Sequence, residues 1–468
     1  MSGESWPNPA VGASRRIIGP RLFAPRRHPP PKPSTRTPRP MSPDRSPPAS
    51  RNYPLLLVGQ FLGAFGDNFL LKAILGPLTY AMTSGRITEA QVNSENALFS
   101  LVFSVPFIVL APLAGFLNDR LPKTAWLVGG NLVKMAGASI GLAGVWAFSG
   151  ASSHTVQVIG YAIVGVGACV YSPAKYGILP EVVATERLVK ANGTVEMLTL
   201  VAIVSGLGLG GILYDRTLSL PACYGAGLAL YVVAFACNAA MTRTPQNRGA
   251  RLSRSFSEFA SNFATLFRSR RLGRILAGSA LFWFAGSTLR SALQGWGLEV
   301  YAQAGISHVT NFKLVLLVLG MVAGIVAGAM LAGRLHRTGD LSWCRRYSFM
   351  MAAGLAALGI LGGRWGLLPA VLVLVATGAA SGLLIVPLNA ALQSESDPAR
   401  LGKTVSVQNF TDYMGIAIGA GYLSFLTRFK LGPNQDLIAL GITVAAITVA
   451  LGFPRPREGQ PDGGGRRG

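Results

Sequence analysis

Long apolar segments separated by short polar ones repeat along most of this 468-residue chain. A segment of about 20 apolar residues is long enough to cross a bilayer as a helix. We count twelve such segments, near residues 53–82, 95–117, 124–148, 154–179, 190–213, 220–241, 274–302, 310–335, 342–362, 365–393, 402–428 and 434–453. The pattern predicts an all-α polytopic membrane protein with twelve transmembrane helices.

A basic connector at about residues 242–273 divides these segments into residues 53–241 and 274–453, and we expect each part to form a six-helix bundle. Its arginines and phenylalanines predict an amphipathic helix at the lipid surface, with these residues involved: Arg268, Arg270, Arg271, Phe256, Phe263 and Phe267. Residues 1–52 are basic and rich in proline, and we expect them and residues 454–468 to be disordered tails. Translation could instead start at Met41, and an Arg-rich leader is also typical of an organelle transit peptide.

The composition excludes several classes of function. Only 13% of the residues are charged, against about 25% in soluble domains, so no large soluble domain is expected. The four cysteines are far apart in sequence and predict buried, reduced thiols rather than disulfides. We find no phosphate-binding loop and no metal-ligand spacing, so we expect no cofactor, no metal and no ATP-driven pumping.

The net charge of +23 is explained by topology rather than by nucleic acid. Counted with the adjoining segment ends, the loops after the even-numbered segments carry eighteen Lys and Arg residues, whereas the loops on the other side carry five. By the positive-inside rule, both termini and the connector are predicted to be cytoplasmic. The cations then face anionic lipid, and no nucleic-acid partner is expected.

Short motifs repeat between the two halves at similar offsets. Gly66-Asp67-Asn68 matches Gly286-Ser287-Thr288 at an offset of 220, and the loop 115–119 matches 333–337 at 218. Ser172-Pro173-Ala174-Lys175 matches Val386-Pro387-Leu388-Asn389 at 214. The order and spacing predict parallel six-helix repeats with a site between them.

Six ionisable residues lie inside predicted spans, away from their ends. They are Asp67, Lys134, Lys175, Glu196, Arg290 and Asp412. Charge at mid-membrane costs roughly 2.5–3.5 kcal/mol on insertion scales, so such residues usually face a bundle interior or a wet cavity. Helical spacing adds polar companions on the same faces, among them Tyr171, Asn389 and Gln408. We therefore expect these side chains to converge on one central cavity.

Several motifs resemble those of a known family. Residues 115–123, Gly-Phe-Leu-Asn-Asp-Arg-Leu-Pro-Lys, resemble the loop motif of major facilitator proteins, with Pro122 in place of the usual glycine. The stretch Tyr171–Glu181, the motif Gln60–Asn68 and the triplets Leu281-Phe282-Trp283, Thr288-Leu289-Arg290 and Val407-Gln408-Asn409 are more specific. Together they resemble the lysophospholipid transporter (LplT) family of the major facilitator superfamily, over residues 53–453.

The resemblance implies a major facilitator fold of two pseudo-symmetric six-helix bundles in a bacterial inner membrane. It implies movement of lysophospholipids, chiefly lysophosphatidylethanolamine, from the outer to the inner leaflet. It further implies a separate acyltransferase or acyl-ACP synthetase as partner, and functional roles for Asp67, Lys175 and Arg290. We expect a monomer and no enzyme activity.

A zwitterionic lipid head would use both signs of charge. Arg290 and Lys175 suit the phosphodiester, and Asp67 with Asn68 suits the ammonium, with Glu196 or Asp412 as alternatives. Lys134, Tyr171, Asn389, Gln408 and Trp283 complete the expected binding set, with apolar walls around Phe282, Trp283 and Phe284 for the acyl chain. Asp119, Arg120, Lys123 and Glu181 are expected to latch the cytoplasmic face.

Other hypotheses stay open. Buried charges of opposite sign often only pair, so a bridge between Lys175 and Glu196 could be a packing clasp or a gating latch. A proton-coupled exporter of drugs or amphiphiles would have the same fold, with Asp67 or Glu196 cycling protons. A lipid acyltransferase fits poorly, since His336 and Asp340 are one residue too close for the usual dyad and no histidine lies mid-span.

Overall fold

The computed structural model describes residues 51–243, 255–306, 311–397, 400–429 and 431–453. Within them the chain is helical almost throughout, and the order of elements follows the predicted apolar segments. In the first half the elements are α1 (Asn52–Ile74), α2 (Gly76–Thr83), α3 (Glu89–Val109), α4 (Ala111–Arg120), α5 (Lys123–Ala147), α6 (Gly150–Val182), η1 (Thr185–Arg187), α7 (Leu188–Thr217) and α8 (Leu220–Ala239). They are followed by α9 (Ser255–Arg268), α10 (Arg270–Gln303), α11 (Asn311–Leu335), α12 (Cys344–Leu361), α13 (Leu367–Glu395), α14 (Leu401–Leu426), η4 (Thr427–Phe429) and α15 (Pro433–Leu451).

Nine helices of the described residues are long and apolar enough to cross a membrane, and the bent pair α3–α4 makes a tenth if it is one span. Helices α12 and α14 do not meet that test, although α12 packs on α13 and α15, and α14 on α10 and α4. The all-α polytopic architecture is therefore confirmed, and the count of twelve spans stays a prediction. The domain limits at 53–241 and 274–453 likewise stay predictions.

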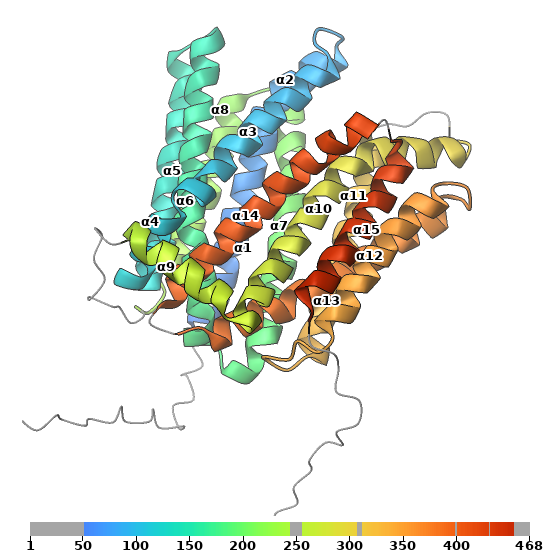
Figure 1. Cartoon of the computed structure of the whole chain (residues 1–468). Helices are drawn as coiled ribbons and strands as arrows, with labels where there is room; N and C mark the ends of the chain where they lie inside the picture. The colour runs from blue at the N-terminus through green and yellow to red at the C-terminus, as the bar shows by residue number, and fades with distance from the viewer. Residues whose placement is uncertain (1–50, 244–254, 307–310, 398–399, 430, 454–468) are drawn as a thin grey trace, which may run out of the picture. The chain divides into compact units, whose positions relative to one another are not determined.

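The helices of each half pack mainly on one another, as the blue-to-green and yellow-to-red groups of Figure 1 show. Small residues permit the closest of these contacts. A methyl group added at Gly137 of α5 would lie 2.5 Å from the Gly160 carbonyl oxygen of α6, so only glycine fits there. The described residues cluster as one compact unit.

Helix α3 ends in a sharp bend. Its start is fixed by Thr88, whose hydroxyl accepts from Gln91 N at 3.4 Å while the Gln91 side chain accepts from Thr88 N at 2.9 Å. Near its end, Pro106 removes one backbone donor, and Pro112 begins α4. The two helix axes differ by 59° across Leu110. This bend separates α3, which lines a pocket, from α4, which packs on α14.

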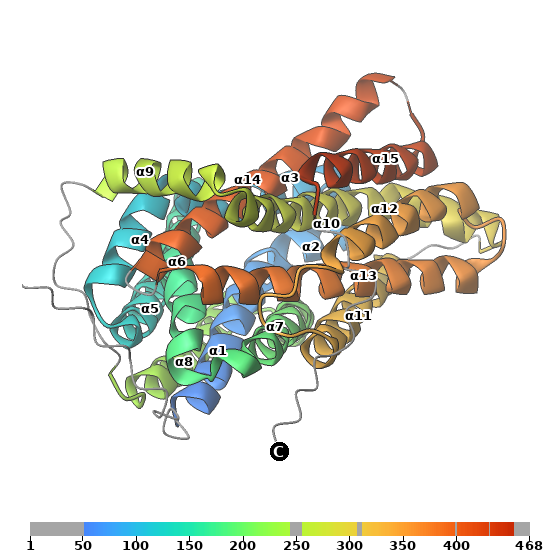
Figure 2. The ribbon, with the colours of Figure 1, turned by 60° about the horizontal axis from the view of Figure 1, so that its bottom comes forward.

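The connector forms the expected amphipathic helix. Helix α9 lies beside α4, α14 and the start of α10, as Figure 2 also shows. Its Phe259 and Phe263 rings pack edge-on against Phe410 of α14, with centroids 5.8 and 6.2 Å away. Arg270 and Arg271 belong to α10 instead.

The cysteine prediction is confirmed. All four thiols are free; Cys169, Cys223 and Cys344 are buried and Cys237 is half-buried. The predictions for residues 1–50 and 454–468 fall outside the described residues.

Candidate functional site

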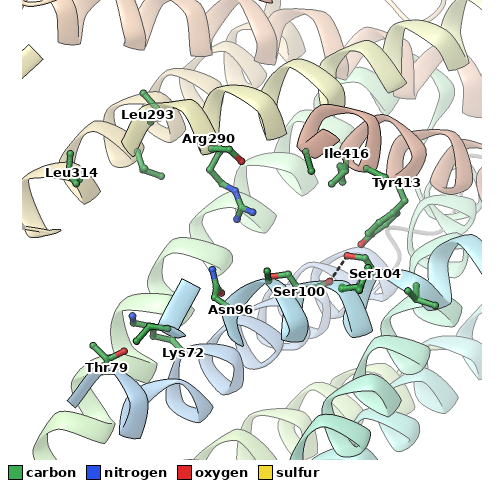
Figure 3. A pocket seen from close by; sticks show the side chains of 18 of the residues that line it. Lys72, Thr79, Asn96, Ser100, Ser104, Arg290, Leu293, Leu314, Tyr413 and Ile416 are labelled. Carbon is green, nitrogen blue, oxygen red and sulfur yellow. Dashed lines mark hydrogen bonds between the residues drawn. The ribbon is translucent and has the colours of Figure 1, made fainter. Parts of the chain in front are cut away.

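A pocket of about 830 Å³ lies between the two halves, lined by α1 and α2, α3, α10, α11 and α14. Its lining combines two cations with polar and apolar side chains, and Figure 3 shows the Arg290 guanidinium pointing into the space between α10 and α3. The polar lining is Lys72, Thr79, Asn96, Ser100, Ser104, Arg290, Ser291 and Tyr413. The apolar lining includes Leu101, Val105 and Ile108 of α3 and Leu314 and Val318 of α11. No acidic side chain is among the described residues that line it.

The pocket floor is an aromatic stack between the halves. The rings of Phe107 and Tyr413 are 4.1 Å apart and 18° from parallel. Phe107 stands on the last turn of α3, just before the bend, and its position there is supported by the Cys169 thiol, which donates to the Pro106 carbonyl at 3.2 Å. The stack joins α3 of the first half to α14 of the second.

The first buried cluster centres on Asp67 of α1. Lys134 Nζ lies 2.7 Å from Asp67 Oδ2, and the Tyr231 hydroxyl donates to Oδ1 at 2.8 Å. The Tyr161 hydroxyl donates to the Asp67 carbonyl at 3.0 Å, and the Lys134 ammonium lies 5.4 Å from the Tyr171 ring centre. Removing either charge would leave the other buried without compensation, which costs about 3–5 kcal/mol.

Asn68 does not join Asp67, contrary to the expected ammonium clamp. Its amide donates to the Ala64 carbonyl of its own helix at 2.9 Å, because adjacent residues of a helix point about 100° apart. The Asp67 carboxylate instead accepts hydrogen bonds from Lys134 and Tyr231.

The second cluster connects both halves through buried hydrogen bonds. Glu196 Oε1 accepts from the Tyr176 hydroxyl at 2.7 Å and from Asn389 Nδ2 at 3.1 Å. Asn389 Oδ1 accepts from Gln408 Nε2 at 2.6 Å. The chain continues through Ser279, which receives a bond from Gln408 at 3.2 Å and donates to Asp412 at 2.7 Å. Trp283 also hydrogen-bonds to Asp412.

Lys175 lies between the two clusters rather than in an ion pair. Its ammonium is 4.3 Å from the Tyr176 ring centre, and Asp67, Lys134 and Glu196 all act on it electrostatically. Among the described residues, no ion pair joins Lys175 to Glu196, whose carboxylate is taken by Tyr176 and Asn389.

The expected single chamber is therefore resolved into separate places. Arg290 lines the pocket, whereas Asp67, Lys175 and the second cluster lie beneath it and do not line it. Phe282 and Phe284 are buried within the second half, so they form no acyl wall in this conformation. Trp283 is half-buried, with its ring edge-on to Phe282 at 5.2 Å.

At the end of the bundle away from the pocket, Asp119 closes what we call the α4–α14 junction, formed by Gly115 and Asp119 with Gly402, Lys403 and Ser406. Asp119 Oδ1 accepts from Gly402 N at 2.8 Å, and Lys403 Nζ lies 4.0 Å from Oδ2. The carboxylate thus caps the start of α14, where a negative charge is favoured.

Of the other three expected latch residues, Lys123 pairs with Glu181 across α5 and α6, within the first half. Exposed Arg120 lies over the Phe116 ring of its own helix at 5.7 Å.

The α7–α11 junction lies on the opposite side of the same end and is formed by Lys190 and Gly193 with Ala329 and Gly333. A methyl group added at Gly193 would lie 2.5 Å from the Ala329 carbonyl oxygen, and one at Gly333 would lie 3.0 Å from Lys190 Cα. Next to it, Asn192 of α7 and Gln393 of α13 exchange two hydrogen bonds of 2.9 and 2.8 Å.

Sequence reasoning missed the aromatic hydroxyls and the pocket's polar side. Tyr176 and Tyr231 donate to the buried carboxylates of Glu196 and Asp67, Tyr161 donates to the Asp67 backbone carbonyl, and Tyr413 stacks on Phe107. Tyr231 and Asn238 stand seven residues apart on one face of α8, a spacing that marks a polar stripe in an apolar helix. Single tyrosines in apolar segments give no such signal.

Comparison with known proteins agrees with this architecture. Residues 50–420 match the model of the Major Facilitator Superfamily. The chain is 32% identical over 404 residues to the lysophospholipid transporter LplT of Photorhabdus laumondii, covering 86% of this chain and 94% of that relative. It is 31% identical to the LplT of Serratia proteamaculans over 422 residues, covering 89% and 99%.

Solved structures show the same fold at low identity. The human organic anion transporter MFSD10 aligns with a TM-score of 0.66 and 16% identity, covering 86% of this chain and 99% of that one. The Escherichia coli fucose:proton symporter FucP aligns with a TM-score of 0.64 and 14% identity, covering 85% and 97%. The chain therefore belongs to the lysophospholipid transporter LplT family of the major facilitator superfamily, and it is a multi-pass membrane transporter rather than an enzyme.

Proposed function

We propose that this transporter moves lysophospholipids from the outer to the inner leaflet of a bacterial inner membrane by alternating access. The observation that carries the proposal is the pocket's lining, which has the two cations Lys72 and Arg290, no acid among the described residues, and apolar side chains of α3 and α11. A single-chain phospholipid has the complementary groups, since its phosphate is anionic and its acyl chain is apolar. The names of the relatives, all lysophospholipid transporters, agree with this cargo.

Arg290 is the proposed phosphate ligand. Its planar guanidinium can donate two parallel hydrogen bonds to two phosphate oxygens, which a lysine cannot do. Lys72 lies on the opposite, α1 side of the pocket and supplies a second positive charge. The polar side chains of Asn96 and Ser100 lie between them, as Figure 3 shows, and can bind glycerol hydroxyls.

The acyl chain is proposed to lie along α3. Leu101 and Val105 line the pocket and are also 59% and 40% exposed, so one apolar strip leads from the pocket to the outer surface of the bundle. Burying a methylene group contributes about 0.8 kcal/mol, so this strip would favour the one-chain lipid over its free headgroup.

In the proposed positive-inside topology, the pocket would face the outer leaflet, and both termini and the two junctions would be cytoplasmic. In this assignment the structure is open outwards, and transport requires the Phe107–Tyr413 stack and both junctions to separate. The buried clusters around Asp67, Lys134, Tyr171, Lys175, Glu196, Asn389, Gln408 and Asp412 would then meet the headgroup. With Asp67 held by Lys134, we assign the ammonium to Glu196 or Asp412 in that state. A separate acyltransferase would restore the second chain, and the transporter would act as a monomer.

Proteoliposomes containing the full chain test the proposal. Labelled lysophosphatidylethanolamine is added outside, and the fraction protected from extraction by albumin is followed with time. We expect inward transfer by the wild type and at least a roughly tenfold loss for Arg290→Gln, since a charge-assisted hydrogen bond contributes about 1.5–3 kcal/mol. Arg290→Lys should retain part of the activity, and Arg364→Gln, an exposed arginine on the same side, should retain all of it.

Transfer equal to that of empty liposomes, or an unimpaired Arg290→Gln, would overturn the proposal. Transport that stops when the proton gradient collapses and is not competed by lysolipid would instead support the proton-coupled exporter.

A further inference from the structure

Helix α9 presents three chemically different faces, and its protein-facing side accounts for only one of them. Phe259 and Phe263 pack on Phe410, and Leu266 is buried. Next to this side the helix carries a second apolar strip that no protein covers, with Phe256 68% and Phe267 40% exposed. Ser257, Ser261 and Arg268 lie on the remaining, polar side and are exposed. Helix periodicity therefore indicates that one side of α9 packs on protein, a second side suits an apolar medium, and the third side faces water.

The acidic and basic residues near α9 also lie on different sides of the helix. The connector at 242–273 has a single acid, Glu258, and seven arginines. Glu258 is turned towards the bundle, where it accepts from Lys403 Nζ at 2.6 Å. Arg268 and Arg270 are exposed. The outer surface thus combines exposed phenylalanines with cations and has its one carboxylate withdrawn, which is the chemistry that binds an anionic membrane surface.

We propose that α9 docks on the anionic phospholipid headgroups of the leaflet beside the α4–α14 junction, and that this docking strengthens the junction. The inference rests on the proposed topology, which makes that leaflet the cytoplasmic one. Lys403 is shared between Glu258 at 2.6 Å and Asp119 at 4.0 Å, so the position of α9 sets where the Lys403 charge lies. Lipid and α14 contact different sides of α9, so both can bind the helix at once. Each then favours the same position of α9, and the two contacts reinforce each other.

A photo-crosslinking amino acid at residue 256 of the full-length protein tests the lipid contact, with the same group at residue 261 on the polar side as the matched control. The probe is radiolabelled phosphatidylglycerol in vesicles of phosphatidylglycerol and phosphatidylcholine. We expect phospholipid adducts from residue 256 and few from residue 261. Each basic residue near an anionic surface changes binding by about fivefold, so Arg268→Gln with Arg270→Gln should lower the yield by roughly tenfold or more.

The second measurement is the distance between spin labels at Leu121→Cys and Arg400→Cys, exposed positions on the two sides of the junction. More phosphatidylglycerol should increase the closed population, and Glu258→Gln should abolish that dependence. Equal adducts at 256 and 261, adducts indifferent to lipid charge, or a junction indifferent to phosphatidylglycerol would each overturn the inference. Neither readout needs transport, so the inference can fail while the proposed function stands, and the reverse.

Discussion

The two junctions at the closed end of the bundle have similar backbones and different chemistry. At the α4–α14 junction an added methyl at Gly115 would lie 3.0 Å from Lys403 Cα, and at the α7–α11 junction one at Gly333 would lie 3.0 Å from Lys190 Cα. The first is closed by a carboxylate on a helix start and by Lys403, which α9 also holds. The second is closed by the neutral amides of Asn192 and Gln393. Of the contacts described at these two junctions, only those of the first involve charged side chains.

The loop beside the α7–α11 junction also makes a neutral contact. Thr338 donates to the Thr185 carbonyl at 2.6 Å, one residue after Arg337, which matches Asp119 in the repeat. Burial lowers the pKa of His336 below its usual value, against the opposing effect of Asp340, so the imidazole is uncharged at pH 7. The α4–α14 junction therefore depends on electrostatic attraction, which acts over several ångströms. The α7–α11 junction depends on short, directional contacts. Small displacements should weaken the second more.

The largest effect is expected from Gly193→Val. The side chain would collide with the Ala329 carbonyl, and overpacking of this kind costs about 1–3 kcal/mol. The α7–α11 junction should stay open and transport should fall by roughly 5- to 150-fold. Spin labels at Arg187→Cys and Arg337→Cys report the separation.

Gly208→Val on the same helix is the control, because nothing lies within 4 Å of its added methyl group. An equal loss in both variants would show that helix propensity, and not the close approach of α7 to α11, causes the effect.

The backbone similarity of the two junctions could have been predicted from the sequence. Arg187-Leu188-Val189-Lys190 and Arg400-Leu401-Gly402-Lys403 match at an offset of 213, close to the offsets of the other repeats. The helix limits were also accessible, because hydropathy depends only on local sequence. The loop motif at residues 115–123 likewise predicted that Asp119 lies at the cytoplasmic end of the bundle, because that motif is also local in sequence.

The pairing of the buried charges was not accessible in this way. Three acids and three bases inside spans require partners, but the choice of Lys134 for Asp67 depends on how α1 and α5 are rotated about their axes. Hydropathy leaves that rotation undetermined, because both helices are apolar around most of their surface. The separation of Arg290 from Asp67 also depends on the conformation of the transporter. One sequence is compatible with several conformations, so it does not specify which one is adopted.

The second prediction concerns the amide pair. Asn192→Ala should destabilise the protein by about 1–3 kcal/mol, because it leaves buried Gln393 without a partner. Replacing both residues, Asn192→Leu with Gln393→Leu, should recover most of that loss, since no polar group is then left buried. Thermal unfolding in detergent of the single and double variants measures the coupling, and purely additive losses would contradict it.

Asp119→Asn should have a smaller and salt-dependent effect. The amide oxygen can still accept from Gly402 N, so the hydrogen bond stays and only the charge at the α14 start is lost. Charge at a helix start contributes about 0.3–1 kcal/mol, and up to about 2 when partly buried. The Leu121–Arg400 label distance should broaden most at low ionic strength. Asn192→Ala serves as comparison, because a neutral contact should respond little to salt.

The smallest effects are expected from replacing Lys190 and Lys403, which occupy equivalent positions in the two halves. Lys403 is 14% exposed at its side chain and contacts Glu258 and Asp119, whereas Lys190 is exposed. Lys403→Gln should therefore open the α4–α14 junction by about 0.2–1 kcal/mol, the usual range for such ion pairs. Lys190→Gln should stay within about 0.5 kcal/mol of the wild type, as surface substitutions do. Label distances across both junctions, measured for both variants, provide the test. An equal response of the two junctions would mean that charge is not what distinguishes them, and that the shared glycine contacts hold both.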